Sequence, residues 1–505
     1  MKILKLLVSR FLIVFLMIAL QLALYFSVWY YLEKRYVWLS MAIDIIAVIV
    51  IISIIGRNQP AVYKLPWIIA ILLLPFAGIT LFLMFGQLNL SKKFADRFKD
   101  VYEVTQNAVK EPDEELKNSL AYGQSSYILN TCHLPAFRHC YNEYLPTGEI
   151  FFNKLEDELL KAERYIMMEY FIVEKGFLWN QIFSILKNKI QQGVKIYFMY
   201  DDIGSISKFP RNFYMELKKE GINAVVFNKF VPITSSVHNN RDHRKITIID
   251  GKTAFTGGAN IADEYINVTH PFGKWKDSGI MIKGQAVDSF VALFLQNYNV
   301  MVRNPLHIDE YVCKEHETFE EKGFVQPYGD GPRPIFNHYV GRDIYLNIIN
   351  QSKKYLYITT PYLIVDFNIL EALCNASKRG VDVRLITPHI PDKKSIYLMT
   401  KSNYTMLIKE GVKVYEYKPG FIHAKTFVCD DEYGVVGTVN LDYRSFLHHY
   451  ECGVWMYKTE SIKPMKQDFL EIVKNESLEM NLKNSHLNPI MRFIRNALNL
   501  FAPLL

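Results

Sequence analysis

One eight-residue pattern occurs twice in this chain of 505 residues and limits what the chain can fold into. The pattern is His-x-Lys-x-x-x-x-Asp, found at 243–250 and again at 423–430. A turn of small residues follows each copy, and an asparagine lies seventeen positions after each histidine, at Asn260 and Asn440. A single copy would most often be a strand with a structural histidine. Two matched copies indicate a duplicated unit with shared chemistry.

The residues between the lysine and the aspartate of each copy are β-branched or aromatic, which is typical of a strand. Side chains of a strand alternate between its faces, so the histidine and lysine of one copy should face the same side. These residues are His243 and Lys245 in the first copy and His423 and Lys425 in the second. We expect the motif aspartates, Asp250 and Asp430, to organise the turn beyond the strand.

The sequence around the motifs repeats in the same order. The first half alternates expected helices and strands at 152–161, 165–173, 181–191, 194–200 and 222–227. The second half does so at 343–353, 355–360, 369–379, 381–386 and 412–417. Such alternation predicts two duplicated α/β halves, at 146–320 and 321–482, with the active site at their interface.

Three apolar runs precede the duplicated region, at 11–31, 38–55 and 65–85. The first is long enough to span a bilayer, and no cleavage site typical of a signal peptide follows it. Residues 1–94 hold nine Lys and Arg against two Asp and Glu, which accounts for the net charge of +7, because the rest holds 49 of each sign. A nucleic-acid-binding domain would carry that excess itself. We therefore expect a membrane anchor of two to three transmembrane helices in 1–94, and no nucleic-acid partner.

The remaining segments are an expected polar connector at 95–145 and an amphipathic tail at 483–505. Pro489 can begin a helix in the tail. Its apolar face would comprise Ile490, Ile494, Ala497 and Phe501. This face could lie in a lipid interface near anionic headgroups or pack onto the protein. The Lys and Arg counts beside the apolar runs slightly favour a cytoplasmic catalytic part.

The paired motifs suit the transfer of a phosphodiester. One histidine can attack phosphorus while the other protonates the departing alcohol, and the two lysines can stabilise the non-bridging oxygens. Asn260 and Asn440 can donate hydrogen bonds to the same oxygens. Since the lysines fill the electrostatic role of a divalent metal, no metal or other cofactor is required. Asp277 and Glu451, downstream of their motifs, could fix the histidine tautomers. They could equally be ordinary surface charges.

With their Gly/Asn turns, the motifs resemble the phospholipase D superfamily and, within it, the bacterial cardiolipin synthases. Pro66-Trp67, Pro361-Tyr362 and the Pro-Leu-Leu505 ending are similar as well. The resemblance implies phosphatidyl transfer between two phosphatidylglycerols in a bacterial cell membrane, giving cardiolipin and glycerol. It also implies a phosphohistidine intermediate, with His243 as nucleophile and His423 as acid and base. Gly258 and Thr438 stand where the family often has serine, and the run at 11–31 is additional.

Two other classes of function remain open on the sequence. A membrane-bound phospholipase D would use water as acceptor, and another phosphatidyltransferase would use a different alcohol; the motifs serve both. A membrane scaffold without activity is disfavoured by two intact motifs.

Overall fold

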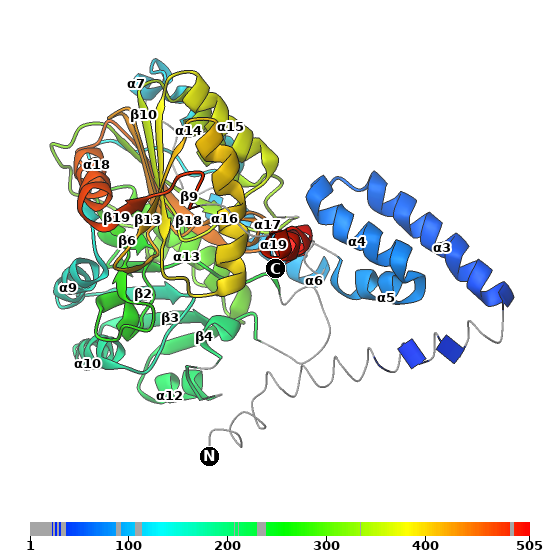
Figure 1. Cartoon of the computed structure of the whole chain (residues 1–505). Coiled ribbons are helices and arrows are strands. Elements are labelled where there is room, and N and C mark those ends of the chain that lie inside the picture. The colour runs from blue at the N-terminus through cyan, green and yellow to red at the C-terminus, as the bar shows by residue number, and fades with distance from the viewer. Residues whose placement is uncertain are drawn as a thin grey trace. The chain divides into compact units, whose positions relative to one another are not determined.

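Figure 1 shows the chain as a computed structural model, in which two compact units can be described separately. The structure describes residues 37–86, 92–106, 114–206, 208–210, 212–229, 239–333, 335–484 and 489–504, with positions 23, 26, 27, 30 and 31. The first unit comprises 1–88, 230–238 and 499–505, and the second comprises 89–229 and 239–498. The expected span at 11–31 therefore lies outside the described residues, apart from those single positions.

Among its described residues, the first unit contains helices α3 (Val37–Gly56), α4 (Ala61–Leu73) and α5 (Pro75–Phe85), which pack against one another. Within the described ranges, no helix combines the length and the apolar character needed to cross a membrane. The run at 65–85, expected as one continuous span, instead folds as the end of α4 followed by α5. Pro75 is the reason, because it lacks an amide hydrogen and disfavours helical geometry at Leu74, whose φ is −142° and ψ 78°.

The second unit is built on two mixed sheets, and Figure 1 labels several of their strands. In order across the first sheet, the strands are β1 (Tyr141–Leu145), β8 (Gly279–Lys283), β6 (Thr253–Gly257), β5 (Ile246–Ile249), β2 (Tyr165–Tyr170), β3 (Lys195–Asp201) and β4 (Asn223–Phe227). Across the second they are β9 (Phe324–Asp330), β18 (Glu451–Tyr457), β16 (Tyr433–Gly437), β15 (Thr426–Cys429), β10 (Tyr355–Thr359), β12 (Asp382–Pro388), β13 (Lys413–Tyr417) and β19 (Ser477–Glu479).

The two sheets match strand for strand. Their motif strands, β5 and β15, each lie between an antiparallel hairpin partner and the first strand of a parallel trio. Among the strands that the structure describes, β19, beyond β13, is the one without a counterpart in the first sheet. The predicted duplication into two α/β halves is therefore confirmed.

Helices cover the sheets where the sequence alternation predicts them. In the first half they are α9 (Gly148–Leu159), α10 (Phe177–Gln191) and α12 (Phe213–Lys219). In the second they are α14 (Val340–Gln351), α15 (Phe367–Lys378), α16 (Lys394–Lys409) and α18 (Ile462–Glu471). All six residues of β2 are buried, as is usual for a strand covered on both faces.

Helix α13 (Val287–Met301) joins the two halves into one core. It contacts β4, β5 and β6 of the first sheet and also β9 of the second. Its side chains are buried almost continuously from Val287 to Val300. A helix buried on all sides must be largely apolar on all sides, and this one is, except for a few polar residues such as Asn297, which donates to Glu169 at 2.8 Å.

The segment 95–145, expected to be a connector, contains several ordered elements. Helix α6 (Lys92–Gln106) packs on α13, and α8 (Tyr122–Cys132) packs on β9 and α14 of the second half. Strand β1 forms the edge of the first sheet by pairing antiparallel with β8. Since this segment contacts both halves, it is part of their common fold.

Candidate active site

The histidine and lysine of each motif lie just before a central strand. Strand β5 begins three residues after His243, and β15 begins three residues after His423. The lysine of each copy folds back so that its Nζ donates to the carbonyl oxygen of the histidine, at 2.6 Å for Lys245 and 2.5 Å for Lys425. Within each copy, the lysine cation therefore lies against the backbone of the motif histidine.

Backbone pairing between the halves positions both histidines. Strand β14 (Gly420–Ile422) pairs in parallel with β7 (Lys274–Lys276), and the N–H of His423 donates to the Lys276 oxygen at 2.7 Å. At the equivalent place a single bridge joins Asp242 to Tyr450, and the N–H of His243 donates to the Tyr450 oxygen at 2.9 Å. His423 is thus held next to Lys276, which comes just before Asp277 in the first half. His243 is held next to Tyr450, which comes just before Glu451 in the second half.

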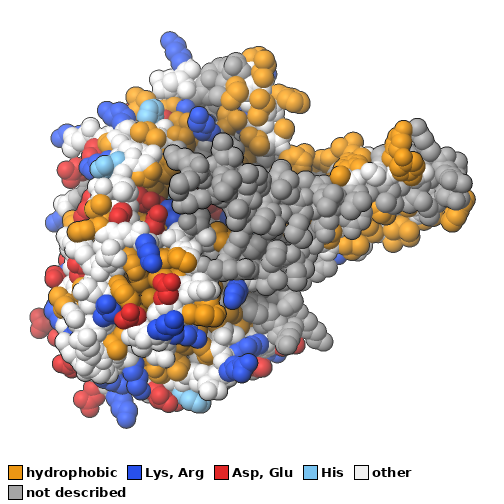
Figure 2. Space-filling model, turned by 90° about the horizontal axis from the view of Figure 1, so that it is seen from below, with side chains coloured by type: hydrophobic (Ala, Val, Ile, Leu, Met, Phe, Trp, Pro, Cys, Tyr) orange, Lys and Arg blue, Asp and Glu red, His pale blue; other side chains and the backbone are white. Residues whose placement is uncertain are grey.

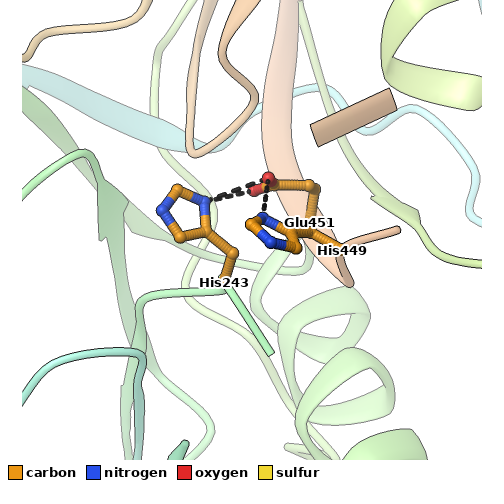
Figure 3. Close-up of side chains that lie close together, drawn as sticks. All are labelled: His243, His449 and Glu451. Atoms are coloured by element: carbon orange, nitrogen blue, oxygen red, sulfur yellow. Dashed lines mark hydrogen bonds and ion pairs between the residues drawn. The ribbon is translucent and has the colours of Figure 1, made fainter. Parts of the chain in front are cut away.

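Those two carboxylates are Glu451 and Asp277. Nδ1 of His243 lies 3.0 and 2.9 Å from the two carboxylate oxygens of Glu451, as Figure 3 shows. Nδ1 of His423 lies 2.7 Å from Oδ2 of Asp277. Each carboxylate therefore contacts the histidine of the opposite half, although each lies downstream of its own motif in the sequence. A carboxylate that accepts the Nδ1 proton leaves Nε2 with the free lone pair.

The two motifs form a single electrostatic site. Burial lowers the pKa of His243 well below its usual value, and the charges of Lys245, Lys425 and His423 lower it further. Burial and Lys425 lower the pKa of His423 to about 4, although Asp277 opposes this effect. Both rings are 6% exposed, so little water screens these charges. Both imidazoles are consequently neutral at pH 7.

The lysines are also shifted towards neutrality. Burial lowers the pKa of Lys245 to about 8, against the attraction of Glu451. Burial likewise lowers the pKa of Lys425 to about 7, against the attraction of Asp277. Asp277 itself has a lowered pKa: burial would raise it, but His423 and Lys425 outweigh burial. A phosphodiester anion placed here would stabilise the charged form of both lysines.

The motif aspartates lie at the opposite ends of their strands. The Asp250 carboxylate accepts hydrogen bonds at 2.8 Å from the backbone amides of 163–165. The Asp430 carboxylate accepts them at 2.7–2.8 Å from the amides of 353–355. Each aspartate therefore fixes the turn that leads into β2 or β10, and neither contacts a motif histidine.

The two asparagines have different surroundings. Oδ1 of Asn260 accepts from the Ile172 amide at 3.0 Å, and its Nδ2 donates to the Tyr265 hydroxyl at 2.7 Å. Asn440 is equally buried, but its Oδ1 accepts no hydrogen bond from the residues that the structure describes. One amide hydrogen of Asn260 is already donated to Tyr265. A hydrogen bond from Asn260 to phosphate would therefore use the other amide hydrogen.

With this geometry in view, comparison with known families is informative. The family model described as "Cardiolipin synthase, PLD-like domain" matches residues 155–286 and again 345–473, one match for each half. The chain belongs to the cardiolipin synthase family. A second family model, the phospholipase D-nuclease N-terminal region, matches residues 42–87. The resemblance identified from the paired motifs is therefore confirmed.

Relatives of this cardiolipin synthase family member cover most of its length. An uncharacterized protein of Streptococcus mutans is 38% identical over 84% of this chain and 92% of its own. A cardiolipin synthase of Geobacillus sp. is 31% identical over 92% of this chain and 94% of its own. The crystal structure of phosphatidylserine synthase from Haemophilus influenzae, at 15% identity, covers 77% of this chain and 100% of that chain with a TM-score of 0.59. That likeness supports the fold.

Gly258 and Thr438, the two positions at which the family often has serine, differ in their surroundings. The Thr438 hydroxyl donates to Oε2 of Glu451 and accepts from the Cys452 amide at 3.0 Å, so it fixes the carboxylate that binds His243. A Cβ added at Gly258 would lie 2.1 Å from Oδ1 of Asp277. A side chain at 258 would therefore require Asp277 to move, which explains the glycine there.

Two aromatic residues near the site were not predicted from the sequence. Trp275 lies with its ring centroid 5.4 Å from that of His423, and His449 lies 5.2 Å from His243. Trp275 precedes Asp277 by two residues, and His449 precedes Glu451 by two. This common spacing is a signal that could have identified both. Among the described residues, His243, His449 and Glu451 also form the one group of three side chains able to hold a metal ion.

Proposed function

We propose that this protein is a cardiolipin synthase, which transfers a phosphatidyl group between two phosphatidylglycerols to give cardiolipin and glycerol. The observation that carries this proposal is that two buried, neutral imidazoles, each bound to a carboxylate of the other half, lie in the field of the same two lysines. One phosphodiester at this site meets a nucleophile, an acid and two cations.

In the first step, Nε2 of His243 attacks phosphorus and a nitrogen–phosphorus bond forms. The bond from phosphorus to the glycerol oxygen breaks, and His423 gives its proton to that oxygen. The bound phosphodiester anion offsets the lysine charges that lower the His423 pKa, so His423 can carry a proton when substrate is present. Lys245 and Lys425 stabilise the charge on the non-bridging oxygens.

In the second step, His423 takes the proton from a hydroxyl of a second phosphatidylglycerol. The hydroxyl oxygen bonds to phosphorus while the bond from phosphorus to His243 breaks, which regenerates the neutral imidazole. The assignment of His243 as nucleophile follows the family resemblance. Asn260 and Asn440 are proposed to donate to the phosphate, and Asp250 and Asp430 to maintain the fold around it.

We further propose that the protein is a multi-pass protein of the bacterial cell membrane, with 1–94 as anchor and 483–505 as a lipid-facing tail. The limits 95–145, 146–320 and 321–482 for the connector and the two halves belong to the same proposal. Helix α3 exposes many large apolar side chains, among them Trp38, Ile45, Ile49 and Ile52. Such exposure is unusual for a surface in water and supports contact with lipid.

The surface of the second unit has a different character. On the face drawn in Figure 2, Lys and Arg are interspersed with Asp and Glu, as the balanced charge of 95–505 predicts. This pattern favours a lipid substrate over nucleic acid, which would bind a continuous basic surface. The active part is proposed to lie in the cytoplasm and to act on anionic membrane lipid.

Thin-layer chromatography of the purified protein with phosphatidylglycerol tests the proposed reaction. Cardiolipin and glycerol formed in equal amounts would support transfer. Phosphatidic acid as the only lipid product would contradict it and establish hydrolysis. A lipid product that forms only when another alcohol is added would instead show a phosphatidyltransferase with a different acceptor.

A further inference from the structure

Figure 3 shows a third group beside the His243–Glu451 pair. The ring of His449 turns Nδ1 towards the same carboxylate, and this nitrogen lies 3.5 Å from Oε1 of Glu451. The ligating atoms of His243, His449 and Glu451 all lie within 4.8 Å of one another. The three side chains therefore direct two nitrogens and a carboxylate at one point.

His449 has no function in the proposed transfer, and its surroundings do not satisfy it. The residue is 6% exposed, and neither ring nitrogen makes a hydrogen bond to any residue that the structure describes. Its ring centroid lies 5.2 Å from that of His243 and 6.2 Å from that of Phe171. Its approach to Glu451 at 3.5 Å is longer than a typical hydrogen bond, so both ring nitrogens remain available to a ligand.

The donor set and spacing fit a transition metal. Zinc binds imidazole nitrogen at about 2.0–2.1 Å and carboxylate oxygen at about 2.0–2.2 Å in tetrahedral geometry, which places neighbouring ligand atoms about 3.3 Å apart. The observed separations from Glu451 are 2.9–3.0 Å for His243 and 3.5 Å for His449. Two histidines and one glutamate are also a common zinc ligand set.

We propose that His243, His449 and Glu451 form an inhibitory site for a divalent transition-metal ion, best matched by Zn²⁺. The proposal rests on the function above, in which His243 attacks through Nε2. A metal bound at Nδ1 uses the lone pair of that nitrogen, so the ring proton moves from Nδ1 to Nε2. Nε2 then has no lone pair for phosphorus, and Glu451 no longer orients the ring.

Among the described residues, the equivalent pair of His423 and Asp277 has no such site. The position equivalent to His449 is Trp275, whose indole nitrogen is a donor only and cannot bind a metal. His423 and Asp277 thus have no third ligand of this kind. The nearby charges of Lys245 and Lys425 oppose a cation at His243, so we expect a chelator to remove the ion readily. One ion per chain is expected.

Direct binding of Co²⁺ to the full-length protein tests the site, because Co²⁺ in a site of low coordination number absorbs visible light. We expect a visible band that saturates at one Co²⁺ per chain and disappears when Zn²⁺ is added. His449→Asn should abolish the band. A matched control is His389→Asn, because His389 also pairs with a glutamate, Glu416 at 2.8 Å, but is 44% exposed and belongs to no group of three possible metal ligands among the described residues. That control should keep the band.

Inhibition is the second measurement, with each variant compared with its own metal-free activity. The Zn²⁺ concentration for half inhibition should rise at least about tenfold in His449→Asn, and a chelator should restore the activity of the unmodified protein. Thermal melts identify misfolding, and His449→Gln serves as a second variant if His449→Asn does not fold.

Two results would overturn the inference: an unmodified protein without a Co²⁺ band, or a band that survives both His449 substitutions. The binding measurement does not depend on lipid chemistry. A protein that binds Co²⁺ through His449 but makes no cardiolipin would refute the proposed function and retain the metal site. Cardiolipin synthesis without a Co²⁺ band would support the proposed function and refute the metal site.

Discussion

Each motif histidine depends on a carboxylate contributed by the other half of the chain. His243 is paired with Glu451, and His423 with Asp277, because short strand pairings place each histidine beside the residue before that carboxylate. Glu451 therefore orients a histidine 208 positions away in the sequence, and Asp277 one 146 positions away. Substitution of a carboxylate should therefore cause the same defect as substitution of the histidine that it contacts.

The exchange of partners predicts crossed effects on the phosphoenzyme. His243→Ala should abolish turnover and form no phosphoenzyme, whereas His423→Ala should accumulate it. Glu451→Gln should behave like His243→Ala with a loss of about 10²–10⁴ in kcat, and Asp277→Asn should behave like His423→Ala. Rapid acid quench with phosphatidylglycerol labelled at phosphorus measures this. A phosphoenzyme that accumulates in Glu451→Gln but not in Asp277→Asn would refute the crossed assignment.

The lowered lysine pKa values predict the pH dependence of kcat/KM. A lysine is charged below its pKa, so the stabilisation of phosphate is complete at low pH. It is lost as the pH rises through about 7 for Lys425 and about 8 for Lys245. The value of kcat/KM should fall over that interval, because it reports the free enzyme.

Lys425→Arg is the matched variant for this prediction, because arginine stays charged throughout the interval. Its alkaline decline should start nearer pH 8, where only Lys245 is titrated. An unchanged profile in Lys425→Arg would show that another group causes the decline.

At the level of elements, the motif aspartates link two neighbouring strands through a turn. Asp430 lies at the end of β15, adopts a positive φ of 56°, and binds the three amides that lead into β10. Asp250 does the same between β5 and β2, also with a φ of 56°. Because both aspartates lie away from the histidines, their substitution should lower stability without changing the chemistry of the histidines.

Asp430→Ala should lower the free energy of unfolding by about 1–3 kcal/mol, because it removes charge-assisted hydrogen bonds to three amides. The folded variant should retain its dependence of activity on pH. Chemical denaturation gives the first quantity. Glu410→Ala is the control, since its exposed pair with Lys378 should contribute about 0–1 kcal/mol. Equal losses in both variants would refute a specific function for Asp430.

At the level of the whole molecule, the ends of the chain provide the apolar surfaces. Helix α19 (Pro489–Phe501) has no buried side chain, and Ile490 and Phe493 are 73% and 75% exposed. Arg492 and Arg495 belong to the same helix. Of the two fates expected for the tail, lipid contact or packing onto the protein, this exposure favours lipid.

Phe493→Glu should therefore weaken binding of the protein to phosphatidylglycerol vesicles by about tenfold, since a buried phenylalanine contributes about 1.5–3 kcal/mol. Activity in detergent micelles at saturating lipid should change little. Asn496→Glu adds the same charge at an exposed polar position and is the control. Vesicle sedimentation measures binding, and equal weakening by both variants would show a charge effect only.

The sequence alone determined the duplication, the order of helices and strands, and the two motifs that meet at the site. These features are local, because β-branched runs form strands and matched spacings repeat within one stretch of chain. Asp277 and Glu451 were also found from the sequence, although their partners were not.

Only the tertiary structure decided which carboxylate binds which histidine, why Gly258 has no side chain, and that His449 lies beside His243. Each depends on pairings between residues far apart in the chain, such as β7 with β14 and Asp242 with Tyr450. Such a contact produces no hydrophobic or polar pattern in the sequence of either segment, because it depends on how the two folded sheets pack together.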